Sequence, residues 1–108
     1  MEKIIVNFAP TGMLITKRDT PYIPIHVDEI VEEVRKAYTI GISSVHVHAR
    51  AVDETPCWEK AVFGEIISGI REFAPDLVIS VTTSGRYYNT YEKRTDVLNL
   101  TGNQKPET

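Results

Sequence analysis

Apolar residues gather in three short runs with strand-like composition and in two longer runs with a helical period. The three short runs are Lys3–Ala9, Ser43–Ala49 and Asp76–Thr82, and all three contain β-branched residues that favour strands. Between them, over residues 29–38 and 62–73, an apolar residue recurs every three or four positions. The pattern therefore predicts the order strand, helix, strand, helix, strand.

Residues that start or stop helices agree with this division. Gly41 follows the first predicted helix and Pro75 follows the second, as is typical of helix ends. The pair Thr55–Pro56 suits a cap and a first-turn proline for the second helix. His26 stands where the first helix should begin, so we expect a capping or surface role for it rather than metal ligation.

Helical connections of this length join parallel strands through right-handed crossovers. Parallel sheets normally occur in larger sets of βα units, because an isolated small sheet leaves its edges open. We therefore predict an α/β fold that is the N-terminal part of a (β/α)8 TIM barrel, in which residues 1–108 form a single partial domain of three βα units. A small, complete doubly wound domain is the alternative.

Composition and charge narrow the class of protein. Of the 108 residues, 42% are hydrophobic and 25% are charged, and the formal net charge is -3. The charges are interspersed and form no basic stripe for nucleic acid, and no apolar run approaches the roughly 20 residues of a membrane span. The start lacks the long apolar stretch of a signal peptide, and Cys57 is the only cysteine. We expect a cytoplasmic protein that binds neither nucleic acid nor membrane.

The strongest chemical signal is the run Val45-His46-Val47-His48. Side chains alternate along a strand, so His46 and His48 share one face while the two valines point to the other. Two imidazoles on one face, two positions apart, can ligate the same metal ion, and Zn²⁺ suits such nitrogen ligands. The alternative is a pair of core histidines with satisfied hydrogen bonds.

Polar or glycine-bearing segments end all three predicted strands. They are Asn7 with Pro10–Gly12, then His46 with His48, then Thr82–Gly85. Active sites of parallel βα sheets lie at the C-terminal ends of the strands, where these segments would meet. The hydroxyl and backbone N–H groups of Thr82–Gly85 suit a carboxylate or an oxyanion, although ordinary βα turns have a similar composition.

Three basic residues are further candidates. Arg50 continues the histidine series and faces either an anionic substrate or, as we expect, a salt bridge to one of the acids Asp53–Glu54. Lys17 and Arg18 lie on the long loop Pro10–Val27. A structureless loop of that length is usually functional. Its two basic residues therefore approach a phosphate or carboxylate, or are solvated surface charges.

Together these segments resemble the zinc-dependent β-keto acid cleavage enzymes, a family that includes the 3-keto-5-aminohexanoate cleavage enzyme. The matching segments are Ala9–Gly12, Thr16–Lys17, Pro21, Pro24, Val45–Arg50 and Thr83–Arg86, and the likeness extends to Lys105–Pro106. Each motif is modest alone, but their order and separations are specific in combination.

The resemblance implies a (β/α)8 barrel that cleaves a β-keto acid with acetyl-CoA to give acetoacetate and an acyl-CoA. It implies that His46 and His48 ligate Zn²⁺, which would polarise the keto oxygen as a Lewis acid. It further implies that Thr82, Thr83 and Gly85 hold the carboxylate of the keto acid. The expected partners are these small molecules, in a homo-oligomer.

Two departures limit this expectation. In the family, a third zinc ligand (a glutamate) and an acid acting as general base come from a distal part of the barrel, beyond residue 108, so we expect residues 1–108 alone to be inactive. In the aminohexanoate-cleaving members an acidic residue on the first loop holds the substrate's amino group, whereas Leu14 stands there in this chain. Leu14 therefore predicts a substrate without a side-chain amine.

Two other classes of protein remain open. One is another metal-dependent barrel, such as an amidohydrolase, which carries its His-x-His motif on the first strand rather than the second. The other is a non-catalytic half barrel that binds a partner. A glutamate ligand further along the gene would favour the keto acid cleavage enzyme over both.

Overall fold

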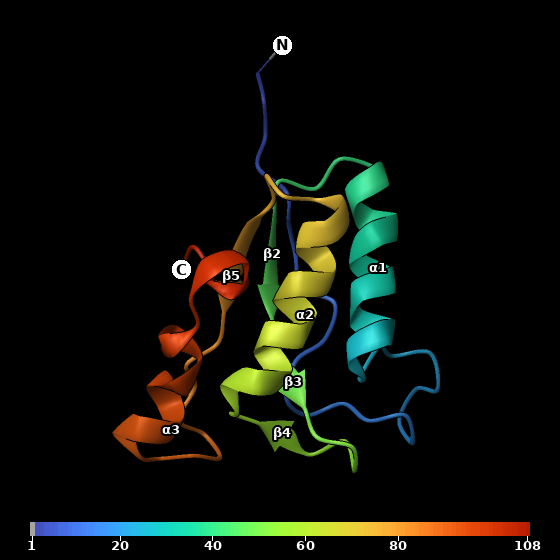
Figure 1. Ribbon diagram of the computed structural model, residues 1–108. Coiled ribbons are helices and arrows are strands. Elements are labelled where there is room, and N and C mark those ends of the chain that lie inside the picture. Colours follow the sequence, from blue (N-terminus) through green and yellow to red (C-terminus); the bar gives the residue numbers. More distant parts are fainter. Residues whose placement is uncertain (1) are drawn as a thin grey trace.

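The computed structural model describes residues 2–108 and contains the predicted order of elements (Figure 1). The helices are α1 (Val27–Thr39), α2 (Lys60–Phe73) and α3 (Tyr91–Thr95), and the strands are β1 (Asn7–Phe8), β2 (Ser44–Val47), β3 (Ala49–Arg50), β4 (Pro56–Cys57) and β5 (Val78–Val81). Two 3-10 turns follow α3, over Asp96–Asn99 and Gly102–Gln104. The predicted strand–helix–strand–helix–strand order is confirmed as β1, α1, β2, α2 and β5.

The principal sheet is parallel, with the strand order β1, β2, β5. Its register pairs Asn7 with Ser44 and His46 with Ser80. The neighbours in space are thus also neighbours in chain order. Both connections contain a helix, as parallel pairing requires.

The end of the chain extends this sheet beyond β5. Val81 donates its N–H to the carbonyl of Thr108 at 2.9 Å, and Thr108 donates to the carbonyl of Ile79 at 3.3 Å. This alternation of bonds is the pattern of parallel pairing. The Glu107 carboxylate also accepts the Ile79 N–H at 2.8 Å and pairs with Arg71 on α2 at 2.6 Å. No pattern in residues 104–108 predicts this arrangement.

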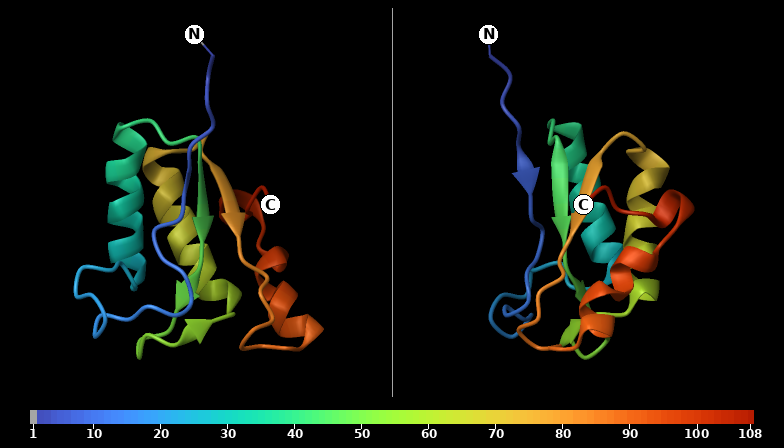
Figure 2. Two further views of the ribbon diagram at one scale, coloured as in Figure 1. Left: turned by 180° about the vertical axis from the view of Figure 1, so that it is seen from behind. Right: turned by 90° about the vertical axis from the view of Figure 1, so that its left-hand side faces the viewer.

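Helices α1 and α2 lie side by side on the same face of the sheet (Figure 2). Their apolar sides and the inward residues of the strands form one core, with Ile30, Val34, Val45, Val47, Phe63, Ile66, Ile67, Ile70 and Ile79 all nearly inaccessible to solvent. A doubly wound domain has helices on both faces. Within residues 2–108 both long helices cover one face, so the sheet is singly wound.

The first strand is shorter than predicted. The expectation was Lys3–Ala9, but only Asn7–Phe8 pair with β2, and Ile4–Ile5 are 79% and 84% exposed. The reason lies in the neighbouring strand. The chain returns from α1 to this segment only at Ser43, whose N–H donates to the carbonyl of Val6, just before β1, at 2.9 Å. Earlier residues of the run have no strand beside them.

The expected cap of the second helix is wrong. Pro56 lies in β4, which pairs antiparallel with β3, and α2 begins later, with Glu59 as its N-cap. The reversal depends on Glu54, whose φ of 73° lies in the left-handed region that non-glycine residues seldom adopt. The side chain of Asp53 accepts hydrogen bonds from the backbone and hydroxyl of Thr55. This local turn chemistry, rather than a helix start, explains the polar residues before Pro56.

Candidate metal and substrate site

His46 and His48 lie on the sheet face that α1 and α2 leave uncovered. Val45 and Val47 point the other way and are 0% exposed, so the predicted alternation is confirmed. The two imidazole ring centres are 5.0 Å apart, with an interplanar angle of 75°. The strand therefore brings the two predicted ligands together at its C-terminal end.

The His46 ring is held from the neighbouring strand. Its Nδ1 lies 2.9 Å from the hydroxyl oxygen of Ser80, its register partner on β5. When the neutral ring carries its proton on Nδ1, that N–H donates to Ser80 and the Nε2 lone pair is left for a metal. Burial lowers the pKa of His46, which favours the neutral ring.

His48 is the more perturbed of the pair. Its burial, and then the positive charges of His46 and Arg50, lower the pKa of His48 to about 4. Its Nδ1 is buried and has no hydrogen-bond partner among residues 2–108. An unsatisfied buried polar atom costs about 1–3 kcal/mol, so the site is poised for a group that would satisfy it.

The separation of the two rings is compatible with a shared metal ion. A metal about 2.1 Å from one nitrogen of each ring would lie roughly 3.2 Å from each ring centre, and a tetrahedral angle would then separate the centres by about 5.2 Å. The observed 5.0 Å is close to this value. Within residues 2–108 no group of three His, Cys, Asp or Glu side chains could hold a metal, so this segment offers the two imidazoles alone.

The turn after β5 lies beside the histidines because Thr82 donates its N–H to the carbonyl of Val47 at 3.2 Å. The Thr82 hydroxyl accepts the N–H of Ser84 at 3.1 Å, which leaves its own proton for another acceptor. Thr83 is exposed, and its carbonyl accepts from Arg94 at 3.0 Å. The predicted carboxylate segment is thus a polar turn at the histidine end of the sheet.

Gly85 gives that turn its close packing. A Cβ at Gly85 would lie 3.0 Å from the side chain of Arg94, tighter than most real contacts. Arg94 therefore crosses directly over the glycine backbone on its way to Thr83. The glycine at this position permits the approach.

The long loop between β1 and α1 lies at the same end of the molecule, next to the β3–β4 hairpin (Figure 1). Leu14 on this loop is 56% exposed. Thr11 is 5% exposed, and its hydroxyl has no hydrogen-bond partner within residues 2–108. The loop thus adds an apolar side chain and a buried hydroxyl at the strand ends.

Two of the three basic candidates, Arg50 and Lys17, are engaged within the chain. Within residues 2–108 Arg50 forms no salt bridge; it donates instead to three backbone carbonyls, those of Gly12, Ile15 and Glu54. The reason is burial, because the guanidinium lies beneath the loop, where carbonyl groups surround it. Lys17 pairs with Glu29 at 2.6 Å and is therefore occupied in holding the loop.

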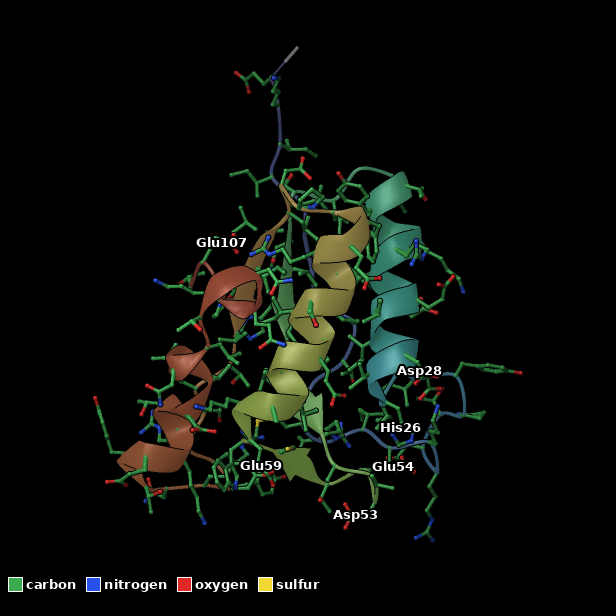
Figure 3. All side chains as sticks on the ribbon, viewed as in Figure 1. His26, Asp28, Asp53, Glu54, Glu59 and Glu107 are labelled. Atoms are coloured by element: carbon green, nitrogen blue, oxygen red, sulfur yellow. The ribbon has the colours of Figure 1, made fainter. Side chains whose placement is uncertain are left out.

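For the two remaining candidates, Arg18 and His26, the structure agrees with what the sequence suggested. Arg18 is exposed, which matches a solvated surface charge. His26 is the N-cap of α1, and its backbone N–H donates to the Glu29 carboxylate at 3.2 Å. The expected capping role is therefore confirmed. Figure 3 labels His26 at the start of α1 and Glu54 on the nearby hairpin turn.

Ser80 and Glu54 were missed by the sequence interpretation. Ser80 carried a usable signal, because it is the one polar residue within the apolar run Val78–Val81 and so marks the face opposite Ile79. No sequence signal marked Glu54. Its contact with the backbone of Lys17 depends on a positive φ and on a loop that is remote in sequence.

The fold and site define a parallel βα protein with two neighbouring imidazoles at the C-terminal end of strand β2. Residues 3–108 match the model of the β-keto acid cleavage enzyme family. The chain belongs to this family.

Curated relatives act on keto acids. The chain is 44% identical over 82 residues to a 3-oxoadipate:acetyl-CoA acetyltransferase of Cupriavidus necator, covering 76% of this chain and 29% of the relative. It is 38% identical over 107 residues to a 3-keto-5-aminohexanoate cleavage enzyme of Acetoanaerobium sticklandii, covering 99% of this chain and 38% of the relative. A 3,5-dioxohexanoate:acetyl-CoA acetone transferase of Paraburkholderia graminis is 34% identical over 93 residues, covering 85% of this chain and 30% of the relative. The chain thus spans between 29% and 38% of the length of these relatives.

Solved structures share the fold. A complex of ObcA with oxaloacetate superimposes with a TM-score of 0.62 at 19% sequence identity, covering 71% of this chain and 22% of that one. Apo ObcA gives the same TM-score. Within residues 2–108, no helix is long and apolar enough to cross a membrane.

Proposed function

We propose that the protein containing this chain cleaves a β-keto acid with acetyl-CoA. The acyl group of the keto acid would move to the CoA sulfur, and its CH₂–COO⁻ unit would join the acetyl group to form acetoacetate. The observation that carries the proposal is the pair of imidazoles, His46 and His48, whose ring centres lie 5.0 Å apart on the open face of a chain that belongs to this family. The names of the relatives support acetyl-CoA as the second substrate.

In this proposal His46 and His48 hold Zn²⁺. When bound, zinc supplies a Lewis acid that polarises the keto oxygen of the substrate. The chain contributes two rings whose burial lowers their pKa values and so favours the neutral form, and Ser80 contacts one of them at Nδ1. Such outer partners raise the basicity of a ligand and set its tautomer.

Thr82, Thr83 and Gly85 would hold the carboxylate of the keto acid. The support is the available hydroxyl proton of Thr82 and the polar turn that follows it beside β2. Hydroxyl and backbone N–H donors form stronger bonds to a charged carboxylate than to a neutral acceptor. These donors would orient the substrate so that its keto group faces the histidines.

Leu14 would select substrates by contacting their tail, meaning the part of the β-keto acid on the far side of the keto group from the carboxylate. The relatives are named for keto acids whose tails carry a carboxylate, an ammonium group or a neutral carbonyl, so tail recognition differs within the family. Leu14 is 56% exposed and offers no partner for a charge. An uncharged tail packed against it would gain about 25 cal/mol per Å² of apolar area, whereas an ammonium group would lose its hydration without compensation.

We further infer that residues 1–108 supply three βα units of a (β/α)8 barrel. The chain-order strands and the single helix-covered face support this, as does the pairing of Thr108 beside β5. The third metal ligand and the general base would come from outside these residues. Catalytic zinc usually has three protein ligands, so we expect no turnover from residues 1–108 alone.

The test uses the natural full-length protein and a panel of β-keto acids with apolar, cationic and anionic tails. We expect acetoacetate and acyl-CoA in equal amounts, with the apolar tail preferred. The variant His46→Ala/His48→Ala should lose both the metal and the activity. A wild-type protein that binds no divalent metal and forms neither product would overturn the proposed function and favour a non-catalytic module.

A further inference from the structure

Arg50 is a charged residue in an unusual setting. It is 4% exposed, yet the ion pairs within residues 2–108 all involve other residues. Buried arginines are generally paired with a carboxylate, because an uncompensated buried charge is costly. Here three backbone carbonyls take the place of the carboxylate.

These carbonyls belong to two separate segments. Nη1 of Arg50 donates to Gly12 at 2.9 Å and Nη2 donates to Ile15 at 2.9 Å, on a loop 35 or more residues earlier in the chain. Nε donates to Glu54 at 2.6 Å, on the hairpin turn. The rigid guanidinium fork thus fixes the backbone on both sides of Leu14 and ties it to the hairpin.

A second contact from the same hairpin turn reinforces this tie. The carboxylate of Glu54 accepts the backbone N–H of Lys17 at 2.8 Å, three residues beyond Leu14. Glu54 adopts a φ of 73° while doing so. Such a conformation costs about 1–3 kcal/mol and persists only where surrounding contacts impose it. The Arg50 and Glu54 contacts therefore hold one defined shape of residues 12–17.

We propose that Arg50 is a positioning residue that sets the conformation of the loop carrying Leu14 and thereby selects the substrate tail. The proposal rests on the proposed function, because it assigns Arg50 to the substrate selection described above. Arginine is required, since lysine has a single ammonium group and cannot span three carbonyls with a planar fork.

The first test needs no substrate. In full-length Arg50→Lys, amide hydrogen exchange over residues 13–19 should accelerate roughly tenfold or more, while α1 and α2 stay protected. The matched control is Arg18→Lys, an exposed arginine on the same loop, which should change nothing. In the wild type, ¹⁵N NMR should resolve the Nη1 and Nη2 protons of Arg50 separately, because both groups are hydrogen-bonded. Unchanged loop exchange in Arg50→Lys, or averaged Nη signals in the wild type, would overturn the positioning role.

The second test separates positioning from general stability. With zinc content unchanged, Arg50→Lys should lower the ratio of kcat/KM for apolar against cationic tails by about threefold or more, because a displaced Leu14 no longer discriminates. A variant that loses both activities equally would overturn the selection role. A wild type that cleaves no keto acid would contradict the proposed function instead, and the exchange comparison would still decide whether Arg50 holds the loop.

Discussion

The hydroxyl of Ser80 lies 2.9 Å from Nδ1 of His46, so one strand of the sheet orients a predicted metal ligand on the next. The two residues are register partners, and the contact therefore follows directly from the parallel pairing of β2 with β5. With the ring proton on Nδ1, the nitrogen available to a metal is Nε2. This arrangement makes the orientation of His46 a property of the fold rather than of a flexible side chain.

The Ser80 contact predicts weaker metal binding in Ser80→Ala. Loss of an outer partner of a histidine ligand typically lowers metal affinity about 10–100-fold. Competition against a chromophoric chelator would measure it. Ser44→Ala is the matched control, because Ser44 lies on the same strand face as His46 but donates its hydroxyl to Asn7 at 2.7 Å rather than contacting a histidine nitrogen. Equal zinc affinities of the two variants would contradict the assigned role of Ser80.

The lowered pKa values predict how metal binding and stability depend on pH. Burial lowers the pKa of His46, and burial with neighbouring charge lowers the pKa of His48 to about 4. Protons should therefore compete with zinc only below the ordinary histidine pKa of about 6.5, with affinity nearly constant between pH 8 and roughly pH 6.5.

The lowered pKa of His48 also makes the stability of the metal-free protein depend on pH. The unfolded chain binds a proton at His48 near pH 6.5, whereas the folded chain resists it until about pH 4, so stability should fall as pH drops through this window. His48→Asn should flatten that part of the profile, measured by denaturant unfolding of the apoprotein. An NMR titration midpoint of His48 at or above 6.5 would contradict both expectations.

Leu14→Glu should reverse the preference for the substrate's tail. A carboxylate on the loop would pair with a cationic tail and repel an anionic one, so kcat/KM for an amine-bearing keto acid should rise relative to an apolar one. Ile15→Glu is the matched control, since Ile15 is the adjacent loop residue and is similarly exposed at 48%. If Leu14→Glu leaves the ratio unchanged, or Ile15→Glu shifts it equally, Leu14 does not select the tail.

Gly69→Ala should destabilise the contact between α1 and α2. Helix propensity alone would favour alanine by about 1 kcal/mol, but the added Cβ would lie 2.8 Å from Cγ2 of Val31. Valine has little rotamer freedom in a helix and cannot turn away. We expect a net loss of about 1–3 kcal/mol in unfolding free energy, against little change for Gly12→Ala, whose Cβ would meet nothing within 4 Å. A stabilised Gly69→Ala would show that the helices can separate without cost.

The sequence predicted those features that depend on local periodicity. Alternation along one strand placed His46 and His48 on a common face, and helical periodicity found α1 and α2. It failed where remote contacts decide the structure. Arg50 looked like a salt-bridge residue because acids follow it in sequence, but its partners include a loop 35 or more residues earlier. Pro56 looked like a helix start because nothing local reveals its strand partner, Arg50.

The most direct test follows the carbon atoms of acetyl-CoA in the full-length wild-type protein. With ¹³C-labelled acetyl-CoA and an apolar β-keto acid, the account predicts acetoacetate that carries both acetyl carbons, formed in equal amount with an acyl-CoA derived from the keto acid. Unlabelled acetoacetate, or consumption of the keto acid without a new acyl-CoA, would contradict it.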